Sequence, residues 1–388
     1  MAFFRNDHVN LLNLHHSIQA LAASGGGAFL GAFLLRQGLP LPIVLLSLAT
    51  ILLGRFILRP WVLWPARRWG LKPLVIAGTI LCALQYPILP HVHGPGWALA
   101  AFILVSAVGE TLYWTTYHAY YAALGDEEDR GQQIGVREAA VALVGIGAPL
   151  LTAWGLMTLG PSWAFGATAL VLLLAALPLL HTPNVTVQDS APSAFPSAWP
   201  AVLMFAADGA LQAGLFLVWP LVLFKALGEN FTAYGGAMAV AALAGAACGL
   251  WLGRTIDMGH GVRAVWVFAG MVLLVALFRI ASQDNPYLAI AANTLGALLP
   301  AVYAPTLMTA IYNQAKSSPC VMRFNIATEG GADIGSASGC IAAAGIIAIG
   351  APASAGVGVA LIGLPFLVAL LWRYYRTPRG RRVSPDTG

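Results

Sequence analysis

Residues 109–138 read GETLYWTTYHAYYAALGDEEDRGQQIGVRE and concentrate more polar chemistry than any other stretch of this apolar chain. At about 3.6 residues per turn, the polar and aromatic residues fall on one face of a helix. They are Glu110, Tyr113, Trp114, Tyr117, His118 and Tyr121. The helix begins in an apolar run at residue 97 and ends at the charged loop 126–130, which requires water. Lipid does not tolerate such a face, so the stripe is expected to line a protein cavity, the alternative being a buried helix contact.

The composition is that of an integral membrane protein. Hydrophobic residues make up 59% of the 388 residues and charged residues 9%, whereas about 25% of residues are charged in a soluble domain. The formal net charge is +5, but the basic residues lie at the ends of apolar runs, so no nucleic-acid partner is expected. The four cysteines, Cys82, Cys248, Cys320 and Cys340, have neither disulfide-framework nor metal-ligand spacing. The lipid bilayer is therefore the expected environment of most of the chain.

Twelve apolar runs are long enough to cross a membrane as helices, which takes about 20 residues each. Six lie in residues 1–181, near 9–35, 41–63, 73–91, 96–123, 133–158 and 162–181. Six lie in residues 199–388, near 199–226, 233–253, 264–283, 287–315, 324–350 and 354–375. Residues 182–198 are rich in Pro, Ser and Ala and predict a flexible cytoplasmic linker. Because basic turns recur at matching places in both halves, we predict an all-α membrane fold of two pseudo-symmetric six-helix bundles.

The placement of basic residues predicts the orientation. Of the 20 Lys and Arg residues, only Arg36, Lys225 and Arg279 fall at connections that follow odd-numbered spans, and the other 17 lie at the opposite ends. Such a bias marks the cytoplasmic side. Both termini, including the basic tail after residue 372, are therefore expected in the cytoplasm, and we expect a monomer in the cytoplasmic (inner) membrane of a bacterium.

At this point the chain resembles the major facilitator superfamily over essentially its whole length. The family's cytoplasmic motif between its second and third spans runs Gly-x-Leu-Ala-Asp-Arg-x-Gly-Arg-Lys. Here Ala66, Arg68, Gly70 and Lys72 match, while Arg67 stands where the motif Asp is expected. Such a motif latches helix ends by charge pairing. The resemblance implies a cytoplasmic latch of Arg68, Gly70, Arg137, Glu138, Gly253 and Asp257.

The resemblance also implies that the first, fourth, seventh and tenth spans line a central cavity. Polar and aromatic residues collect in those spans of this chain. The candidate substrate-cavity residues are His16, Gln19, Tyr113, Trp114, Tyr117, His118, Gln212, Trp219 and Tyr303. Walls of this kind suit an amphipathic or partly aromatic organic molecule.

Acidic residues within the spans are the candidates for proton coupling. A carboxylate in the middle of a membrane is costly, so each one must be paired, protonated or hydrated. By their depth we predict that Glu110 and Asp208 carry the transported proton, with Glu329 next. The alternative for each is a structural hydrogen bond.

Two arginines and several histidines leave further alternatives open. Arg55 and Arg59 in the second span could meet an anionic substrate, but arginines near a cytoplasmic span end more often reach out to lipid headgroups. His15, His16 and His118 titrate near neutrality, yet no pair of these ligands has a metal-binding spacing. We therefore expect no metal and no cofactor.

The favoured function is a secondary transporter of a small organic solute that works by alternating access and is coupled to protons. The chain has no Gly-rich phosphate loop that ends in Gly-Lys-Ser/Thr, so direct ATP use is not expected. The alternative is a polytopic membrane enzyme acting on a lipid or lipid-linked substrate, with His91 and His93 at the outer interface. That alternative needs a paired acid and base at one membrane face, and the short outer loops supply few acids. We therefore do not expect an enzyme.

Overall fold

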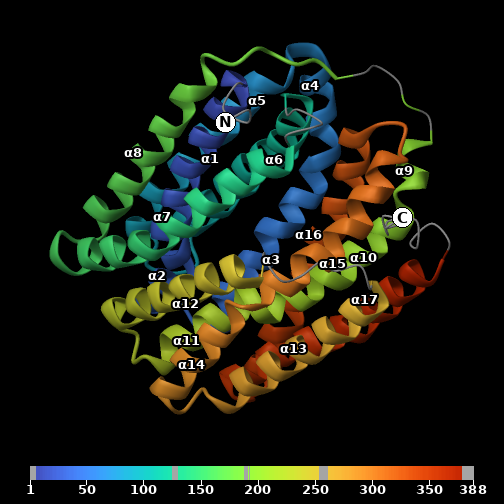
Figure 1. Cartoon of the computed structure of the whole chain (residues 1–388). Helices are drawn as coiled ribbons and strands as arrows, with labels where there is room; N and C mark the ends of the chain where they lie inside the picture. The colour runs from blue at the N-terminus through green and yellow to red at the C-terminus, as the bar shows by residue number, and fades with distance from the viewer. Residues whose placement is uncertain (1–5, 125–129, 188–190, 192, 253–260, 378–388) are drawn as a thin grey trace. The chain divides into compact units, whose positions relative to one another are not determined.

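A computed structural model describes all residues except 1–5, 125–129, 188–190, 192, 253–260 and 378–388, and within that part the chain is helical (Figure 1). Twelve helices there are long and apolar enough to cross a membrane. The predicted all-α membrane fold with twelve spans is therefore confirmed. By its contacts the chain divides into two compact units.

Unit 1 comprises Met1–Ala191 together with Gly228–Leu243. Its first three spans contain α1 (Asp7–Ala22), η2 (Ala23–Gly27), α2 (Ala28–Arg36), α3 (Leu41–Leu58), η3 (Arg59–Val62), α4 (Leu63–Trp69), α5 (Leu71–Ile88) and η4 (Leu89–His91). Its next three are α6 (Trp97–Leu124), α7 (Arg130–Thr158) and α8 (Pro161–Leu179). Within the unit α5 packs on α6 and α8, α1 packs on α7 and α8, and α3 packs on α6.

The contact between α5 and α6 depends on glycine. A Cβ atom added at Gly78 of α5 would lie 2.5 Å from the backbone nitrogen of Tyr113, and one at Gly109 of α6 would lie 2.9 Å from the backbone nitrogen of Cys82. Small residues allow membrane helices to approach this closely. The approach sets the position of α6, which carries the polar stripe.

The beginning of α12 (Phe231–Leu252) packs with unit 1, although the sequence assigns it to the second bundle. Tyr234 OH donates a hydrogen bond to the Ala28 carbonyl at 3.1 Å, and its ring meets the Phe29 ring edge-on at 5.2 Å between centroids. The division of the chain at residues 182–198 into two domains stays a prediction.

Unit 2 comprises Pro192–Leu227 and Ala244–Gly388. Its helices are α9 (Ala194–Ser197), α10 (Trp199–Gln212), η5 (Ala213–Val218), α11 (Trp219–Ala226), the end of α12, α13 (Gly261–Ala281), α14 (Pro286–Gly296), α15 (Leu299–Lys316), α16 (Val321–Ala348), η6 (Ala353–Gly358) and α17 (Val359–Arg376). The helix α10 packs on α16 and α17, and Ser336 Oγ of α16 donates to the Gly209 carbonyl of α10 at 3.0 Å.

The first and seventh spans are both interrupted by a π-helical segment, η2 in unit 1 and η5 in unit 2. In η2 the backbone of Gly25 leaves helical geometry, with φ −82° and ψ −107°. Such segments turn the side chains on either side out of the regular helical register. Spans one and seven occupy the same position in their halves of the chain, so the repeat predicted from basic turns extends to helix geometry.

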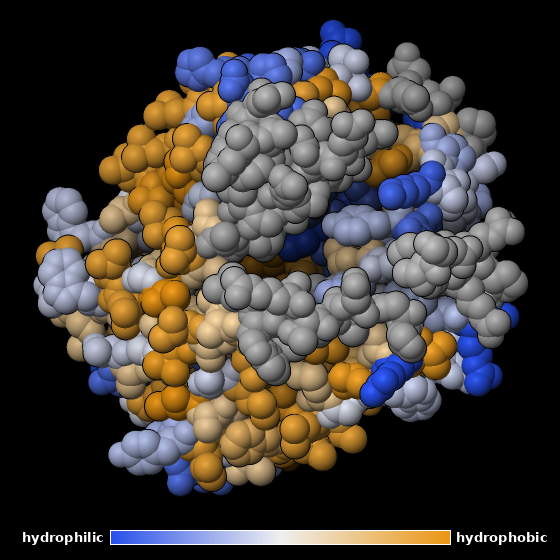
Figure 2. Space-filling model, in the orientation of Figure 1, coloured by the Kyte–Doolittle hydropathy of each residue, from blue (hydrophilic) through white to orange (hydrophobic). Residues whose placement is uncertain are grey.

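Large apolar side chains are exposed along the spans, and hydrophobic residues cover much of the visible face in Figure 2. Trp61, Trp97 and Trp163 are each about three-quarters exposed, at 74%, 78% and 75%. A water-soluble protein rarely presents so much apolar surface, whereas a lipid-facing surface requires it.

Candidate functional site

The polar stripe on α6 divides into two rows when the helix is packed in unit 1. Tyr113, Tyr117 and Tyr121 are buried. Glu110, Trp114 and His118 follow one another at intervals of four residues, and all three are partly or fully exposed. Because residues four apart share a helix face, the accessible row consists of a carboxylate, an indole and an imidazole.

The buried tyrosines pack against two histidines of α1. His15 is fully buried, and its Nδ1 lies 2.7 Å from the Ala175 carbonyl oxygen of α8. A carbonyl only accepts hydrogen bonds, so Nδ1 carries the proton and Nε2 accepts one from Tyr113 OH, 3.1 Å away. His15 therefore fixes α1, α6 and α8 together through one neutral ring.

A stack of rings continues from this contact. The Tyr113 and Tyr117 rings lie 5.4 Å apart and 11° from parallel, and the His16 ring stacks on Tyr117 at 5.2 Å and 12°. On the accessible row the Trp114 and His118 rings lie 5.5 Å apart at 25°. The structure thus brings together five of the predicted cavity residues, His16, Tyr113, Trp114, Tyr117 and His118. Gln19 lies one turn beyond His16 on α1 and is partly exposed.

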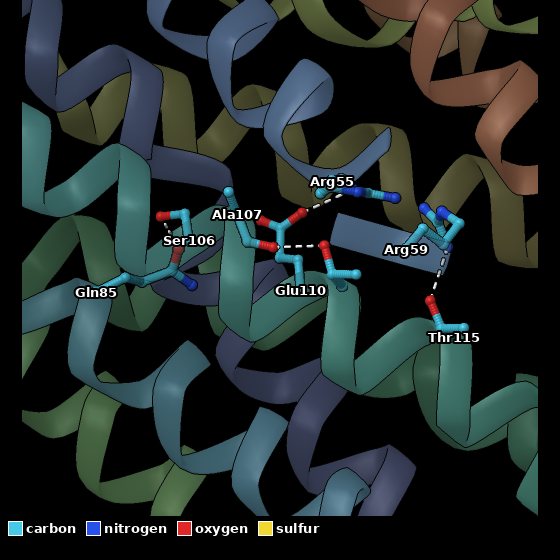
Figure 3. A network of polar contacts seen from close by, with 8 residues as sticks. Arg55, Arg59, Gln85, Ser106, Ala107, Glu110 and Thr115 are labelled. Atoms are coloured by element: carbon cyan, nitrogen blue, oxygen red, sulfur yellow. Dashed lines mark hydrogen bonds and ion pairs between the residues drawn. The ribbon is translucent and has the colours of Figure 1, made fainter. Parts of the chain in front are cut away.

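Glu110 has a partner that the sequence analysis did not assign to it. Arg55 Nη1 of α3 lies 2.7 Å from Glu110 Oε2, and the two side chains point toward each other (Figure 3). The pair remains partly accessible, with 18% of the Arg55 side chain and 27% of the Glu110 side chain exposed. The Glu110 carboxylate is thus stabilised by an ion pair.

Arg59 lies one helical turn beyond Arg55 and is 1% exposed. Its Nη1 donates to Thr115 Oγ1 of α6 at 2.9 Å. Since Arg59 is buried and Arg55 is paired, the interpretation that both arginines reach lipid headgroups is wrong. Sequence position alone could not reveal this, because the partners lie 55 and 56 residues away.

Unit 2 holds a second polar cluster, around Asp208 of α10. Asp208 is 1% exposed. Tyr303 OH of α15 donates a hydrogen bond to its Oδ1, and Gln212 Nε2 donates to its Oδ2 at 2.7 Å. Gln212 Nε2 also lies 3.2 Å from Tyr303 OH. Three predicted residues therefore form one cluster, in which the groups that bond to the carboxyl are neutral.

A third contact group surrounds Trp219, which is also buried in unit 2. Trp219 Nε1 donates to Asn293 Oδ1 of α14 at 3.0 Å. The guanidinium of Arg279, from α13, lies 4.9 Å from the centre of the Trp219 ring, and its Nη1 donates to the Leu215 carbonyl of η5 at 2.6 Å. The sequence alone did not indicate this role of Arg279. The available signal was its position, because Arg279 is one of only three basic residues at connections that follow odd-numbered spans.

The remaining predicted acid is less central. Glu329 is partly exposed on α16, and Asp333, one turn further on, is 2% exposed. Among the described residues, no group of three or more His, Cys, Asp and Glu side chains could hold a metal ion.

The cytoplasmic latch residues are only partly visible. Gly253 and Asp257 lie outside the described residues, as do the side chains of Arg137 and Glu138, whose backbone belongs to α7. Arg68 is exposed near the end of α4. Gly70 ends α4 with φ +85°, a conformation that favours glycine.

Residues 182–185, here named the strap, are bonded to the turn at Gly70. Asn184 Nδ2 donates to the Trp69 carbonyl at 2.7 Å, and Asn184 Oδ1 accepts from the Lys72 backbone at 3.2 Å. The Leu71 backbone nitrogen donates to the Val185 carbonyl at 2.8 Å. The prediction of a flexible linker is therefore wrong for these four residues.

Two further side chains hold the strap. Lys72 Nζ donates to the carbonyls of Leu180 and Thr182, at 2.7 and 2.8 Å. Tyr120 OH of α6 lies 2.7 Å from Thr182 Oγ1 and also contacts the Pro183 carbonyl. The strap thus connects the end of the sixth span with the turn between the second and third spans and with α6. Nothing in the sequence around Asn184 indicated that this segment bonds to the turn at Gly70.

Known proteins resemble the chain in family and in fold. The family model described as Major Facilitator Superfamily matches residues 16–204. The structure of an auto-inhibited POT family peptide transporter has a TM-score of 0.67 at 14% identity, covering 95% of this chain and 97% of its own. The human organic anion transporter MFSD10 (TETRAN) has a TM-score of 0.67 at 17% identity, with coverages of 93% and 99%. The POT family transporter PepTSo has a TM-score of 0.65 at 11% identity, with coverages of 95% and 98%. No curated protein matches the sequence.

Proposed function

Because the chain belongs to the major facilitator superfamily, we propose that it is a secondary transporter that carries a small organic solute by alternating access and is coupled to protons. Such a protein opens its solute site to one side of the membrane at a time. Coupling requires a side chain that takes up a proton on one side and releases it on the other. Coupled transport therefore requires such a group within the spans.

The cluster at Asp208 is the observation that carries the proposal. Its carboxyl is buried in the seventh span and bonded to the neutral groups Tyr303 OH and Gln212 Nε2. A carboxyl group held in this way can gain or lose a proton without breaking an ion pair. Both neighbours can reorient, since a hydroxyl and an amide each donate and accept hydrogen bonds. We therefore assign Asp208 as the principal proton-coupling residue.

Glu110 is the second coupling residue of the proposal, and its role differs. Its carboxylate is paired with Arg55 at 2.7 Å, so its protonation would release a guanidinium. Glu110 therefore couples proton uptake to the release of Arg55 from its ion pair, whereas Asp208 couples it to a rearrangement of neutral hydrogen bonds. Glu329 remains a third candidate on the strength of its place in the eleventh span.

The experiment that tests this function starts with a solute. A thermal-shift screen of the purified protein against metabolites identifies compounds that bind, since a ligand stabilises the folded state. The protein is then reconstituted in proteoliposomes, and solute accumulation is measured with and without an imposed pH gradient. We expect accumulation with the gradient and only equilibration without it.

The variant Asp208→Asn tests the coupling residue. Asparagine has the same shape but cannot lose a proton, so gradient-driven accumulation should be lost while exchange of internal for external solute continues. Asp284→Asn is the matched control, because Asp284 is exposed in the connection between α13 and α14. Accumulation by Asp208→Asn at the wild-type level would remove Asp208 from the mechanism. Failure of any tested solute to move through the wild-type protein would count against transport itself.

A further inference from the structure

We propose that Arg55 binds an anionic group of the transported solute in exchange for Glu110, and that the solute is an aromatic carboxylate. This inference rests on the proposed transport function and specifies its substrate class. It follows from the charge of the site, from its accessibility and from the rings beside it.

The charge of this part of unit 1 favours an anion. Arg55 and Arg59 place two guanidinium groups within one helical turn, and the Glu110 carboxylate lies 2.7 Å from Arg55. The bilayer offers little solvation for ions, so a ligand that binds Arg55 there is favoured if it is an anion. Guanidinium groups also match carboxylates in geometry, since they donate two parallel N–H groups. A carboxylate is therefore the ligand that these residues suit best.

The two arginines differ in what they can offer a ligand. Arg59 is 1% exposed and bonded to Thr115, so a ligand cannot reach it directly. Arg55 and Glu110 remain partly exposed, so their contact is accessible to a molecule outside the protein. An incoming carboxylate would replace Glu110 as the acceptor of the Arg55 N–H group. The guanidinium would then keep an anionic partner throughout.

The rings beside the pair select an aromatic body for that anion. Trp114 and His118 continue the accessible row of α6 one and two turns beyond Glu110, and their rings are stacked. Trp114 is held edge-on by the buried Tyr113 ring at 4.9 Å between centroids. An aromatic surface held in place by buried neighbours binds planar ligands with little loss of side-chain freedom. A solute with its carboxylate on Arg55 could lay its ring along this row.

The exchange accounts for the proton as well. A proton binds to the Glu110 carboxylate, its ion pair with Arg55 opens, and the solute carboxylate accepts the freed N–H group. One proton and one anion enter together, so the site keeps the same charge. Arg55 of α3 is the ion-pair partner of Glu110, and α5, which packs on α6, contributes the ionisable groups Cys82 and Tyr86. Arg59 lies on η3, and α1 contributes His15 and His16 further along.

Binding to the purified full-length protein tests the inference directly. The probes are indole-3-acetate, its neutral amide and the cation tryptamine, which share one ring system. We expect the acid to bind the wild-type protein and the amide and the cation to bind about tenfold more weakly or less. Arg55→Gln should weaken binding of the acid by about tenfold or more, because it removes the charged donor.

Glu110→Gln should affect binding of the acid in the direction opposite to Arg55→Gln. This variant distinguishes an exchange of carboxylates at Arg55 from an ion pair with only a structural role. Removal of the competing carboxylate should strengthen binding of the acid at neutral pH and abolish the dependence of its affinity on pH. Arg36→Gln is the matched control, since Arg36 is exposed at the end of α2. If Arg55→Gln does not fold, Glu110→Gln decides alone.

Equal binding of the acid and its amide, or weaker binding of the acid to Glu110→Gln, would overturn the inference. The outcome is distinct from that of the transport assay. Coupled flux of a solute that is not an acid would refute the substrate class and leave the proposed transport function standing. Tight, Arg55-dependent binding without any flux would refute transport and leave the binding site standing.

Discussion

At the scale of single residues, two acids that the sequence does not distinguish as coupling candidates have different hydrogen-bond and ion-pair partners in the structure. Glu110 and Asp208 both lie within apolar spans. Glu110 contacts a cation, whereas Asp208 is bonded to a hydroxyl and an amide. The partners come from helices that are distant in sequence, and no periodicity along α6 or α10 points to them. The sequence therefore predicted which residues in the spans are acidic, and it left open which groups bond to each carboxyl.

Glu110→Gln should abolish accumulation driven by a pH gradient while exchange continues. Glutamine keeps the shape of the side chain and can still accept a hydrogen bond from Arg55, but it cannot release a proton. We expect the ratio of internal to external solute to fall to about one, because without coupling only the solute gradient drives flux. Proteoliposome assays with and without the gradient measure this ratio. Accumulation at the normal rate would make Glu110 a structural acid.

Tyr113→Phe should lower the stability of unit 1 by about 1 kcal/mol, the contribution of one buried hydrogen bond. The change removes the donor to His15 Nε2 and leaves that nitrogen buried without its partner. A lower thermal unfolding temperature of the purified protein is the expected result. Tyr287→Phe serves as the control, since Tyr287 is 82% exposed. Equal unfolding temperatures for the two variants would argue against the assigned contact.

At the scale of helices and turns, the prediction succeeded where one periodic pattern decided the outcome. Twelve apolar runs gave twelve spans. For the stripe on α6, Tyr113, Tyr117 and Tyr121 are buried in a helix contact, which was the alternative to a cavity, and the cavity itself stays a prediction. The prediction failed where a short polar segment forms its contacts with a distant turn. Residues 182–185 resemble a linker in composition, yet Asn184 bonds to both sides of Gly70, more than 110 residues away. The composition of a segment indicates whether it tends to be flexible, but it does not indicate which distant residues the segment contacts.

Asn184→Ala should loosen the turn between α4 and α5. The variant loses the hydrogen bonds to the Trp69 carbonyl and the Lys72 backbone, at a cost of about 1 kcal/mol. Arg67 and Arg68 lie exposed beside this turn, so trypsin should cleave there faster, because cleavage follows local opening.

Thr186→Ala is the control for this change, since it alters the same segment at an exposed side chain. Gly70→Ala should have the larger effect, because φ is +85° and the added Cβ would lie 2.3 Å from Asn184 Oδ1. Cleavage of Asn184→Ala at the rate of Thr186→Ala would show that the strap does not hold the turn.

At the scale of the whole molecule, the distribution of charge predicts an orientation that side-chain contacts do not address. Seventeen of the 20 basic residues lie on the side of both termini. A cytoplasmic location of that side follows from the positive-inside rule. The orientation is defined relative to the two sides of the membrane, so contacts within the protein do not determine it. It is therefore tested by an experiment in cells.

Single cysteines test the orientation in a background without the four native cysteines. Tyr287→Cys, near the beginning of α14, should react with a membrane-impermeant maleimide in intact cells, because Tyr287 is exposed and the predicted orientation places this end of α14 outside. Ser384→Cys, in the basic tail, should react only after the cells are permeabilised. Labelling of the tail in intact cells would reverse the topology.

The strap also shortens the free connection between the sixth and seventh spans. Val185 is bonded to the Leu71 backbone, and α9 begins at Ala194, so only the eight residues 186–193 lie between these two points. At about 3.3–3.6 Å for each extended residue, this connection can reach at most about 29 Å. Release of the strap would add its four residues and lengthen the connection by half. The hydrogen bonds of the strap therefore set how much chain is free between the sixth and seventh spans.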